Sequence, residues 1–243
     1  MRLVRFLYVD NGGIIRGKAS NVDGLPGRLR SGIGLVKAMQ AMNMLDQLQP
    51  LLELDMGPVG EVRLVPDLDT YHQLPWSPRS AMMLCDMLEL DLTPWAACAR
   101  SFLRRQRDRA RAAGITFLAT FEDEFYLLDQ QSGQPIDDGL CFSTVSFDAA
   151  EGVIQAIVAN LETLGLRVEH YYPELGRGQH EISVQPEEAM RAADNQVFFR
   201  ETVRGTARQH GFLASLAPKP FPDDAGSGAH VHFSLWDQER THN

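Results

Sequence analysis

The sequence predicts an α+β protein in which a small β-rich domain precedes a larger domain with helices on one face of a mainly antiparallel sheet. Short strand-like runs separated by Gly and Pro dominate residues 1 to about 90. Three later segments alternate polar and apolar residues, as half-buried strands do, and segments with helical apolar spacing lie between them. A joint at Leu92-Thr93-Pro94 predicts domains of 1–91 and 92–243.

The first domain is predicted from short strands and turn residues. Residues 3–10 and 13–19 are β-like runs joined by Asn11-Gly12-Gly13, which indicates a hairpin. Apolar residues at helical spacing over 34–48 predict a helix. Residues 60–88 are expected to form strands that prolines interrupt.

The second domain is expected to open with a helix and a long strand. Thr93 is a preferred N-cap residue and Pro94 favours the first helical position, so a helix is predicted over 95–113. Gly114 then ends this helix. Residues 115–128 alternate polar and apolar side chains and predict a strand.

Helices and strands alternate through the rest of this domain. Asp148 and Glu151 have the spacing of a capping box and predict the start of a helix, which ends at Gly165. Four further elements are expected in order: strands at 166–172 and 178–184, a helix from Pro186 to near Gly211, and a final strand within 225–236.

Charge and composition bear on partners and location. The formal charge of -9 argues against binding to nucleic acid or to an anionic membrane, because both need a basic surface. The three cysteines lack metal-ligand spacing and favour a reducing compartment over a disulfide framework. With no run of about 18 apolar residues and no signal-peptide core, the chain is expected in the cytoplasm and not in a membrane.

Three of the predicted strands carry ionisable or polar groups on one face. Glu122 and Glu124 share one face of the strand over 115–128, whose other face is apolar. Glu181 and Ser183 share a face with Gln179 and Gln185, opposite Ile182 and Val184. In the last strand, His230, His232 and Ser234 alternate with Val231, Phe233 and Leu235, whose side is expected to lie against the helices.

These faces suggest a metal site. One polar strand face is usually only solvated, but three faces with metal-ligating groups favour a common site. The Cα atoms of Glu122 and Glu124 are about 6.5–7 Å apart in a strand, which suits two neighbouring ions that hold a phosphoryl group. Oxygen ligands with few imidazoles favour Mg²⁺ or Mn²⁺, and the absence of thiolates argues against structural zinc.

Three motifs in this order resemble the glutamine synthetase family: EDEFYL from Glu122, ELGRGQHEI from Glu174 and GSGAHVHFSLW from Gly226. The earlier stretches VDNGGIIRGK, LVPDLDTYHQLPW and CDM resemble the β-grasp amino-terminal domain of that family. The resemblance covers nearly the whole chain. It implies a β-grasp-like domain over 1–91 and the first part of the glutamine synthetase catalytic domain over 92–243.

The resemblance also implies an ATP-dependent ligase that amidates glutamate by ammonia. ATP would phosphorylate the γ-carboxylate of glutamate, and the amine would displace phosphate from the γ-glutamyl phosphate. Mg²⁺ or Mn²⁺ ions are the expected cofactors. Family members build rings in which the amino-terminal domain of one subunit completes the active site of its neighbour, so a large homo-oligomer is expected.

Site residues are assigned by the same resemblance. Glu122 and His230 match ligands of the ion that handles the transferred phosphate. Glu124, Glu174 and Glu181 match ligands of the ion at the glutamate site. The remaining matches are the ATP contacts Glu169, His232 and Ser234, and Gly226, whose backbone meets the substrate glutamate.

Three departures from the family pattern concern the substrate and the activity. Ala225 stands where the family usually has Asn before Gly-Ser-Gly. No Asp-Gly-Ser-Ser-like element, which helps bind ammonium, lies between Ser31 and Asp55. The family's catalytic domain continues for about as long again beyond Asn243, and that part is expected to carry the phosphate- and glutamate-binding arginines and the sixth metal ligand.

Several alternatives stay open beside the ammonia ligase. One is a γ-glutamyl ligase for an organic amine or polyamine, and another is a catalytically inactive module that keeps the fold. A third is an unrelated soluble protein with fortuitous polar strands. Residues 1–243 alone are expected to bind Mg²⁺ or Mn²⁺ weakly, to lack ligase turnover, and to expose an apolar surface that promotes self-association.

Overall fold

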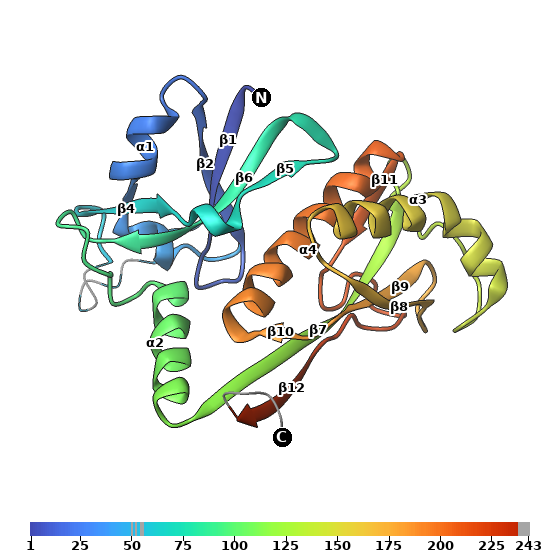
Figure 1. Cartoon of the computed structure of the whole chain (residues 1–243). Coiled ribbons are helices and arrows are strands. Elements are labelled where there is room, and N and C mark those ends of the chain that lie inside the picture. Colours follow the sequence, from blue (N-terminus) through green and yellow to red (C-terminus); the bar gives the residue numbers. More distant parts are fainter. Residues whose placement is uncertain (50, 52, 54–55, 238–243) are drawn as a thin grey trace. The chain divides into compact units, whose positions relative to one another are not determined.

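The computed structural model describes residues 1–49, 51, 53 and 56–237 (Figure 1). The chain divides into two units, Met1–Asp108 and Arg109–Asn243, and each unit contains its own sheet. The predicted α+β class is confirmed. The domain boundary predicted between residues 91 and 92 stays a prediction.

A mixed sheet forms the first unit. Its strands are β1 (Leu3–Val9), β2 (Ile15–Asn21), β3 (Ile33–Val36), β4 (Glu61–Pro66), β5 (His72–Leu74) and β6 (Ser77–Leu88), with helix α1 (Leu25–Ser31) after β2. The sheet order is β2-β1-β6-β4-β3, and β5 pairs with β6. β1 and β6 are parallel, while the other pairs are antiparallel. The predicted hairpin is present, and the Asp10 carboxylate closes its turn by accepting hydrogen bonds from Gly12 N and Ile14 N, both at 2.9 Å.

The core of the first unit extends beyond its strands. Phe6, Val62 and Leu64 are completely buried on the sheet. Trp95 and Cys98, which follow the last strand, belong to the same buried cluster. The segment that leads out of the sheet is therefore anchored in this unit by apolar contacts.

The prediction of a helix over residues 34–48 is wrong. β3 extends to Val36, and a 3-10 helix, η1 (Lys37–Ala41), follows it. Asn43 then turns the chain, because its side-chain oxygen accepts hydrogen bonds from Leu45 N at 2.9 Å and Gln47 N at 3.0 Å. Asparagine competes in this way with helical hydrogen bonds, and apolar spacing alone does not reveal that competition.

The helix predicted over 95–113 starts later than expected. The Thr93 hydroxyl donates to Asp91 at 2.7 Å, and Trp95 N donates to the carbonyl of Met87 at 3.1 Å. This segment therefore pairs with the end of β6 and does not cap a helix. The helix α2 spans Ala99–Ala112, and Gly114, with φ of 82°, ends it as predicted.

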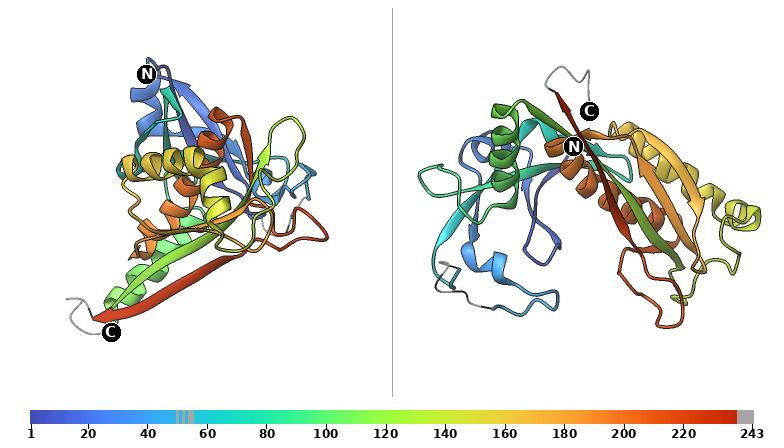
Figure 2. Two further views of the ribbon diagram at one scale, coloured as in Figure 1. Left: turned by 90° about the vertical axis from the view of Figure 1, so that its right-hand side faces the viewer. Right: turned by 90° about the horizontal axis from the view of Figure 1, so that it is seen from below.

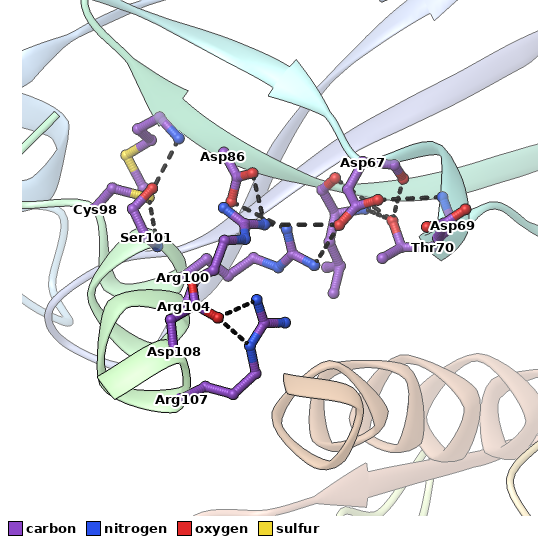
Figure 3. A network of polar contacts seen from close by, with 12 residues as sticks. Asp67, Asp69, Thr70, Asp86, Cys98, Arg100, Ser101, Arg104, Arg107 and Asp108 are labelled. Carbon is purple, nitrogen blue, oxygen red and sulfur yellow. Dashed lines mark hydrogen bonds and ion pairs between the residues drawn. The ribbon is translucent and has the colours of Figure 1, made fainter. Parts of the chain in front are cut away.

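Paired charges hold α2 to the strands of the first unit (Figure 3). Arg100 lies 2.9 Å from Asp67 and 3.1 Å from Asp86, and Arg104 lies 2.9 Å from Asp86. Asp86 is on β6, and Asp67 directly follows β4. The two arginines thus join one face of α2 to two neighbouring strands.

The sheet of the second unit is antiparallel throughout, as predicted. Its strands are β7 (Ile115–Asp129), β8 (Val168–Pro173), β9 (Gln179–Val184), β10 (Glu187–Glu188), β11 (Phe212–Ser215) and β12 (Ala229–Asp237). β7 pairs with β9 and β10 along one edge and with β11 and β12 along the other. Figure 2 shows β7 in green and β12 in dark red running side by side in both views.

Two helices, α3 (Thr144–Thr163) and α4 (Ala189–Gln209), cover one face of this sheet, as predicted. The ring of Phe125 on β7 lies 6.3 Å from that of Phe199 on α4. The ring of Phe147 on α3 lies 5.2 Å from that of Tyr171 on β8. Buried apolar side chains of the two helices, including Ile157, complete this layer. The other face of the sheet carries the side chains of Glu122, Glu124 and Glu181.

Both helices start at residues other than those predicted. α3 begins after Ser143, whose side chain accepts a hydrogen bond from the second helical residue at 3.2 Å, and so it starts upstream of Asp148. α4 begins after Glu188, because residues 187–188 first pair with β7 as β10. The predicted ends are confirmed: each helix stops just before a glycine with positive φ, Gly165 at 82° and Gly211 at 80°.

The apolar side of β12 is exposed, contrary to the expectation that it lies against the helices. Val231, Phe233 and Leu235 are 52%, 63% and 48% exposed. The ring of Phe233 stacks on that of Phe117 of β7 at 5.0 Å. Because α4 packs across β7, β10 and β11, it does not cover this part of the strand.

Candidate functional site

The candidate site is built around β7, whose neighbours bring acidic and imidazole side chains onto one face. Glu122 pairs directly with Ser183 on β9 and with His230 on β12. Glu124 pairs with Glu181 on β9. Directly opposed residues of antiparallel strands project to the same face. Three strands therefore contribute polar side chains to the face opposite α3 and α4.

Glu122 lies beside two imidazoles of β12. His232 Nε2 is 3.0 Å from Glu122 Oε2, and His230 Nδ1 is 3.8 Å from the same oxygen. The side chains of His230 and His232 are 67% and 60% exposed, so solutes can reach them. The structure thus brings together Glu122 and His230, which the sequence assigned to one ion, and adds His232 beside them.

Glu181 lies deeper in the site, at 4% exposure. Burial raises the pKa of Glu181, and a hydrogen bond donated by the Tyr172 hydroxyl partly offsets this effect. The negative charges of Glu122, Glu174 and Glu124 raise the same pKa further. Four carboxylates therefore concentrate negative charge in one place, and a bound cation would relieve their repulsion.

The carboxylate of Glu124 is held by the buried side chain of Gln179. Gln179 Nε2 donates to Glu124 Oε2 at 2.8 Å and to the carbonyl of Gly226 at 2.9 Å. The other carboxylate oxygen of Glu124 faces Gly228, where an added Cβ would come within 2.9 Å of it. Glycine at position 228 therefore leaves space for the Glu124 carboxylate beside β12.

Glu174 belongs to the turn between β8 and β9. Its backbone N–H donates to the carbonyl of Gln179 at 2.8 Å. Its carboxylate accepts a hydrogen bond from Leu175 N at 2.9 Å. The turn thus places Glu174 near enough to Glu181 for its charge to contribute to the raised pKa of that residue.

The loop before β12 carries Gly226 and is anchored to β7. The buried hydroxyl of Tyr126 donates to the carbonyl of Ala225 at 2.6 Å. A Cβ at Gly226 would lie 3.0 Å from the carbonyl of Pro218, so the loop packs tightly at this position. The backbone around Gly226 is thereby held next to Glu124.

The two other residues assigned to ATP lie elsewhere along the strands. Glu169 is exposed on β8, at a bulge where the pairing with β9 shifts by one residue. Ser234 pairs with β7 four residues from Glu122, which is about 13 Å along the strand. Its hydroxyl accepts a hydrogen bond from Trp236 Nε1 at 2.7 Å. Ser234 is therefore farther along the strand than the carboxylates.

The donor set fits a hard divalent cation. Within the residues that the structure describes, no three His, Cys, Asp or Glu side chains are arranged to hold a metal ion as they stand. The side chains in place form smaller groups, with Glu122 beside two imidazoles and Glu124 paired with Glu181. Mg²⁺ in phosphoryl-transfer sites takes one or two carboxylates and fills its other positions with water and phosphate oxygens. Donor type and charge therefore fit Mg²⁺ or Mn²⁺.

The sequence predicted no role for two residues that shape the site, or for a third, Asp123, that lies behind it on the face covered by α4. Gln179 and Tyr172 hold Glu124 and Glu181. Gln179 lies two residues before Glu181 on the same face of β9, which is a usable signal, whereas Tyr172 meets Glu181 across the pairing of β8 with β9, which no local pattern reveals. Asp123, between the two outward glutamates, is 3% exposed and accepts a hydrogen bond from Gln196 of α4 at 2.5 Å. The sequence signal for Asp123 is that a charged residue stands on the otherwise apolar face of the predicted strand.

Two family models match the chain. The glutamine synthetase N-terminal domain matches residues 1–95, and the glutamine synthetase catalytic domain matches residues 96–243. The chain belongs to the glutamine synthetase family. The family predicted from the three motifs is thereby confirmed.

Curated relatives in the family are longer than this chain. The type-1 glutamine synthetase 1 of Dictyostelium discoideum is 30% identical over 258 residues, which cover 98% of this chain and 52% of the relative. A glutamate–isopropylamine ligase of Pseudomonas sp is 28% identical, and the match covers 96% of this chain and 54% of the ligase. The chain therefore spans about half the length of these relatives.

Solved structures share the fold. A crystal structure of a novel glutamine synthase homolog superposes with a TM-score of 0.87 at 33% identity, over 97% of this chain and 55% of the other. The GmaS/ADP complex superposes with a TM-score of 0.88 at 24% identity, over 100% of this chain and 55% of the other. The arrangement of elements is thus that of glutamine synthetase-like proteins.

Proposed function

We propose that this chain is part of an ATP-dependent ligase that joins an amine to the γ-carboxylate of glutamate. The observation that carries the proposal is the shared face of β7, β9 and β12, where Glu122, Glu124 and Glu181 stand with His230. Clustered carboxylates with an imidazole suit the divalent cations of phosphoryl transfer. Membership in the glutamine synthetase family supports the same chemistry.

Two groups of side chains would hold the ions. Glu122 and His230 would bind one ion, and Glu124, Glu174 and Glu181 would bind the other. Mg²⁺ or Mn²⁺ bound there supplies positive charge to the phosphate oxygens during transfer. Burial raises the pKa of Glu181, and the Tyr172 hydroxyl, which keeps this side chain in place, partly offsets that rise and so favours the charged carboxylate that a cation requires.

The proposed reaction has two steps. A γ-carboxylate oxygen of glutamate attacks the γ-phosphorus of ATP, which gives γ-glutamyl phosphate and ADP. The amine nitrogen then attacks the γ-carbonyl carbon and loses a proton, and phosphate leaves. Residues of this chain hold the reactants and form no covalent bond: His232, Ser234 and Glu169 would contact ATP, and the backbone at Gly226 would contact glutamate.

Ammonia is the proposed amine, and an organic amine or polyamine is the second candidate. Ala225 offers no side-chain amide, and no Asp-Gly-Ser-Ser-like element lies between Ser31 and Asp55, a range that includes positions outside the described residues. The similarity to a relative named glutamate–isopropylamine ligase also favours testing organic amines. ADP formation by the full-length protein with ammonia and with each organic amine separates the two candidates.

Location and assembly are part of the proposal. No helix in the described part of the chain is long and apolar enough to cross a membrane. The net charge of -9 supports a protein that binds neither nucleic acid nor an anionic membrane. Free cysteines support a cytoplasmic location. A ring-type homo-oligomer is proposed for the full-length protein, and light scattering tests it.

Calorimetric titration with Mn²⁺ tests the site itself. We expect weak binding by the chain, and we expect Glu124→Ala and Glu181→Ala each to weaken it by about 10-fold or more. Glu151→Ala, which removes an exposed carboxylate on α3, is the control and should leave the affinity unchanged. An affinity that neither site variant changes would contradict the assigned ligands and favour a catalytically inactive module.

Glutamate-dependent ATP hydrolysis is the second measurement. We expect no turnover by residues 1–243, because stabilising the transferred phosphoryl group needs positive charges beyond the ions. In relatives that are about twice as long, those charges are expected in the other half. Robust turnover by this chain alone would show that the catalytic groups have been assigned to the wrong residues.

A further inference from the structure

Gln179 connects three parts of the candidate site through one side-chain amide. It begins β9 and is 1% exposed. Its Nε2 donates to Glu124 Oε2 at 2.8 Å and to the carbonyl of Gly226 at 2.9 Å, and its Oε1 accepts from Gly176 N at 2.8 Å. One buried amide thus joins β7, the turn that contains Glu174, and the loop before β12.

The chemistry of these partners determines the orientation of the amide. A carboxylate and a carbonyl accept hydrogen bonds, so both must face the NH₂ group of Gln179, whereas the N–H of Gly176 must face its oxygen. A flipped amide would set its oxygen against two acceptors. The side chain therefore has one favourable orientation, and it holds one oxygen of Glu124 while the other faces Gly228.

The backbone ties the same turn to the same residue. Gln179 N donates to the carbonyl of Gly176 at 2.9 Å, and Glu174 N donates to the carbonyl of Gln179 at 2.8 Å. A Cβ at Gly176 would lie 2.1 Å from the Tyr126 hydroxyl and 2.8 Å from Gln179 Oε1, so only glycine fits there. The turn is therefore closely packed against the amide at Gly176.

We propose that Gln179 is a positioning residue of the ligase site, which orients the Glu124 carboxylate for cation binding and holds the Glu174 turn and the Gly226 loop beside it. This inference rests on the proposed function, because it takes Glu124 as a cation ligand. Gln179 acts through Glu124: its NH₂ group is a hydrogen-bond donor and does not ligate a cation. Hydrogen-bond partners of metal ligands typically change metal affinity by about 10- to 100-fold.

Gln179→Met tests the proposal, because methionine fills a similar volume and donates no hydrogen bond. We expect the Mn²⁺ affinity of the chain, measured by calorimetry, to fall about 10-fold or more. Urea unfolding of the same protein shows whether the fold is retained. If the methionine variant does not fold, Gln179→Asn takes its place, since it keeps the amide but is too short to reach all three partners.

A double-mutant cycle with Glu124→Ala separates positioning from a general structural role. If Gln179 acts through Glu124, Gln179→Met weakens Mn²⁺ binding in the unchanged chain and has a smaller effect when Glu124 is already alanine. Equal fold-changes in both backgrounds would overturn the inference. So would an unchanged affinity in the Gln179 variants when Glu124→Ala alone weakens binding.

The same titrations distinguish failure of the inference from failure of the proposed function. No Mn²⁺ binding by the unchanged chain, or binding that Glu124→Ala leaves as it was, would overturn the proposed metal site and this inference with it. Binding that depends on Glu124 but not on Gln179 would overturn the inference alone. Glu151→Ala is again the control for loss of an exposed charge.

Discussion

Neighbouring residues of β7 occupy opposite environments. Glu122 and Glu124 face the candidate site, while Asp123 points to α4, where it is 3% exposed and accepts a hydrogen bond from Gln196. Burial raises the pKa of Asp123 to about 6, although the bond from Gln196 and the charge of Arg200 oppose the shift. A buried carboxyl group whose pKa is raised destabilises the fold when it is charged.

Asp123→Asn should therefore stabilise the metal-free chain at neutral pH. The folded pKa of about 6 lies above the usual 3.8, so the group's stabilising contribution is present below 3.8 and is lost as pH rises through 6. At pH 7.5 the free energy of urea unfolding should be higher in the variant by roughly 2–3 kcal/mol. The difference in unfolding free energy between the variant and the unchanged chain should vanish toward pH 4.

Comparing the two chains at each pH removes the effect of other titrating groups. Burial lowers the pKa of His180, on the neighbouring strand, from 6.5 to about 4. Its contribution to stability is therefore lost in both chains as pH falls through that range. Unfolding free energies that stay equal from pH 4.5 to 7.5 would contradict the environment described for Asp123.

Among the elements, α2 depends on paired charges more than on apolar burial. Its one buried residue is Ser101. Arg100 and Arg104 reach Asp67 and Asp86 from the face of the helix that meets the strands (Figure 3). The side chain of Arg100 is 15% exposed, so solvent screens these pairs less than it screens pairs on the open surface.

Arg100→Ala should lower the free energy of unfolding by about 1–3 kcal/mol, because it leaves two partly buried carboxylates side by side with one guanidinium fewer. Arg107→Ala on the same helix is the control. It breaks a pair with Asp108, whose side chain is 57% exposed, and should change stability by less than about 0.5 kcal/mol. If Arg100→Ala and Arg107→Ala lowered the free energy of urea unfolding equally, the partly buried pairs would contribute no more to stability than an exposed pair on the helix surface.

The contacts of α2 and of the segment before it explain where the chain divides into two compact units. The family models divide the chain after residue 95, whereas the two compact units divide it after Asp108. Trp95 and Cys98 lie in the core of the first unit, and Arg100 continues those contacts into the helix. The start of the catalytic-domain match therefore packs with the first unit.

For the whole molecule, the exposed apolar side chains of β12 are expected to promote self-association of the chain. Val231, Phe233 and Leu235 alternate along this strand and are about half exposed or more. Among the described residues, β12 pairs with β7 along one edge, and its other edge has no strand partner. A long apolar edge strand promotes association between chains.

Val231→Lys combined with Leu235→Lys should therefore reduce self-association of the 243-residue chain. Both side chains lie on the face opposite the histidines of β12, and Phe233 keeps its stack on Phe117. Light scattering over a range of concentrations should show a rising mass for the unchanged chain and a lower mass for the variant. Leu140→Lys, at a loop position 80% exposed, is the control. A monomer at every concentration would contradict this prediction.

Three of the errors in the predicted elements have a common cause. Alternation over 115–128 predicted β7 correctly, because the two-residue period of a strand is set by its own backbone. Which side chain accepts hydrogen bonds from the free backbone N–H groups determined where α3 and α4 start, and why no helix forms over 34–48. Ser143, Glu188 and Asn43 accept these bonds, and composition alone ranks several residues equally for that role.

The sequence by itself determined which side chains share a strand face, because alternation along a strand needs no other part of the chain. It thereby placed Glu122 with Glu124, and His230 with His232, and its motifs identified the family. Only the tertiary structure decided which strands are neighbours and which groups are buried. The amide of Gln179 meets Glu124 and Gly226 across 55 and 47 residues, and such contacts depend on strand register and loop packing, which no local pattern specifies.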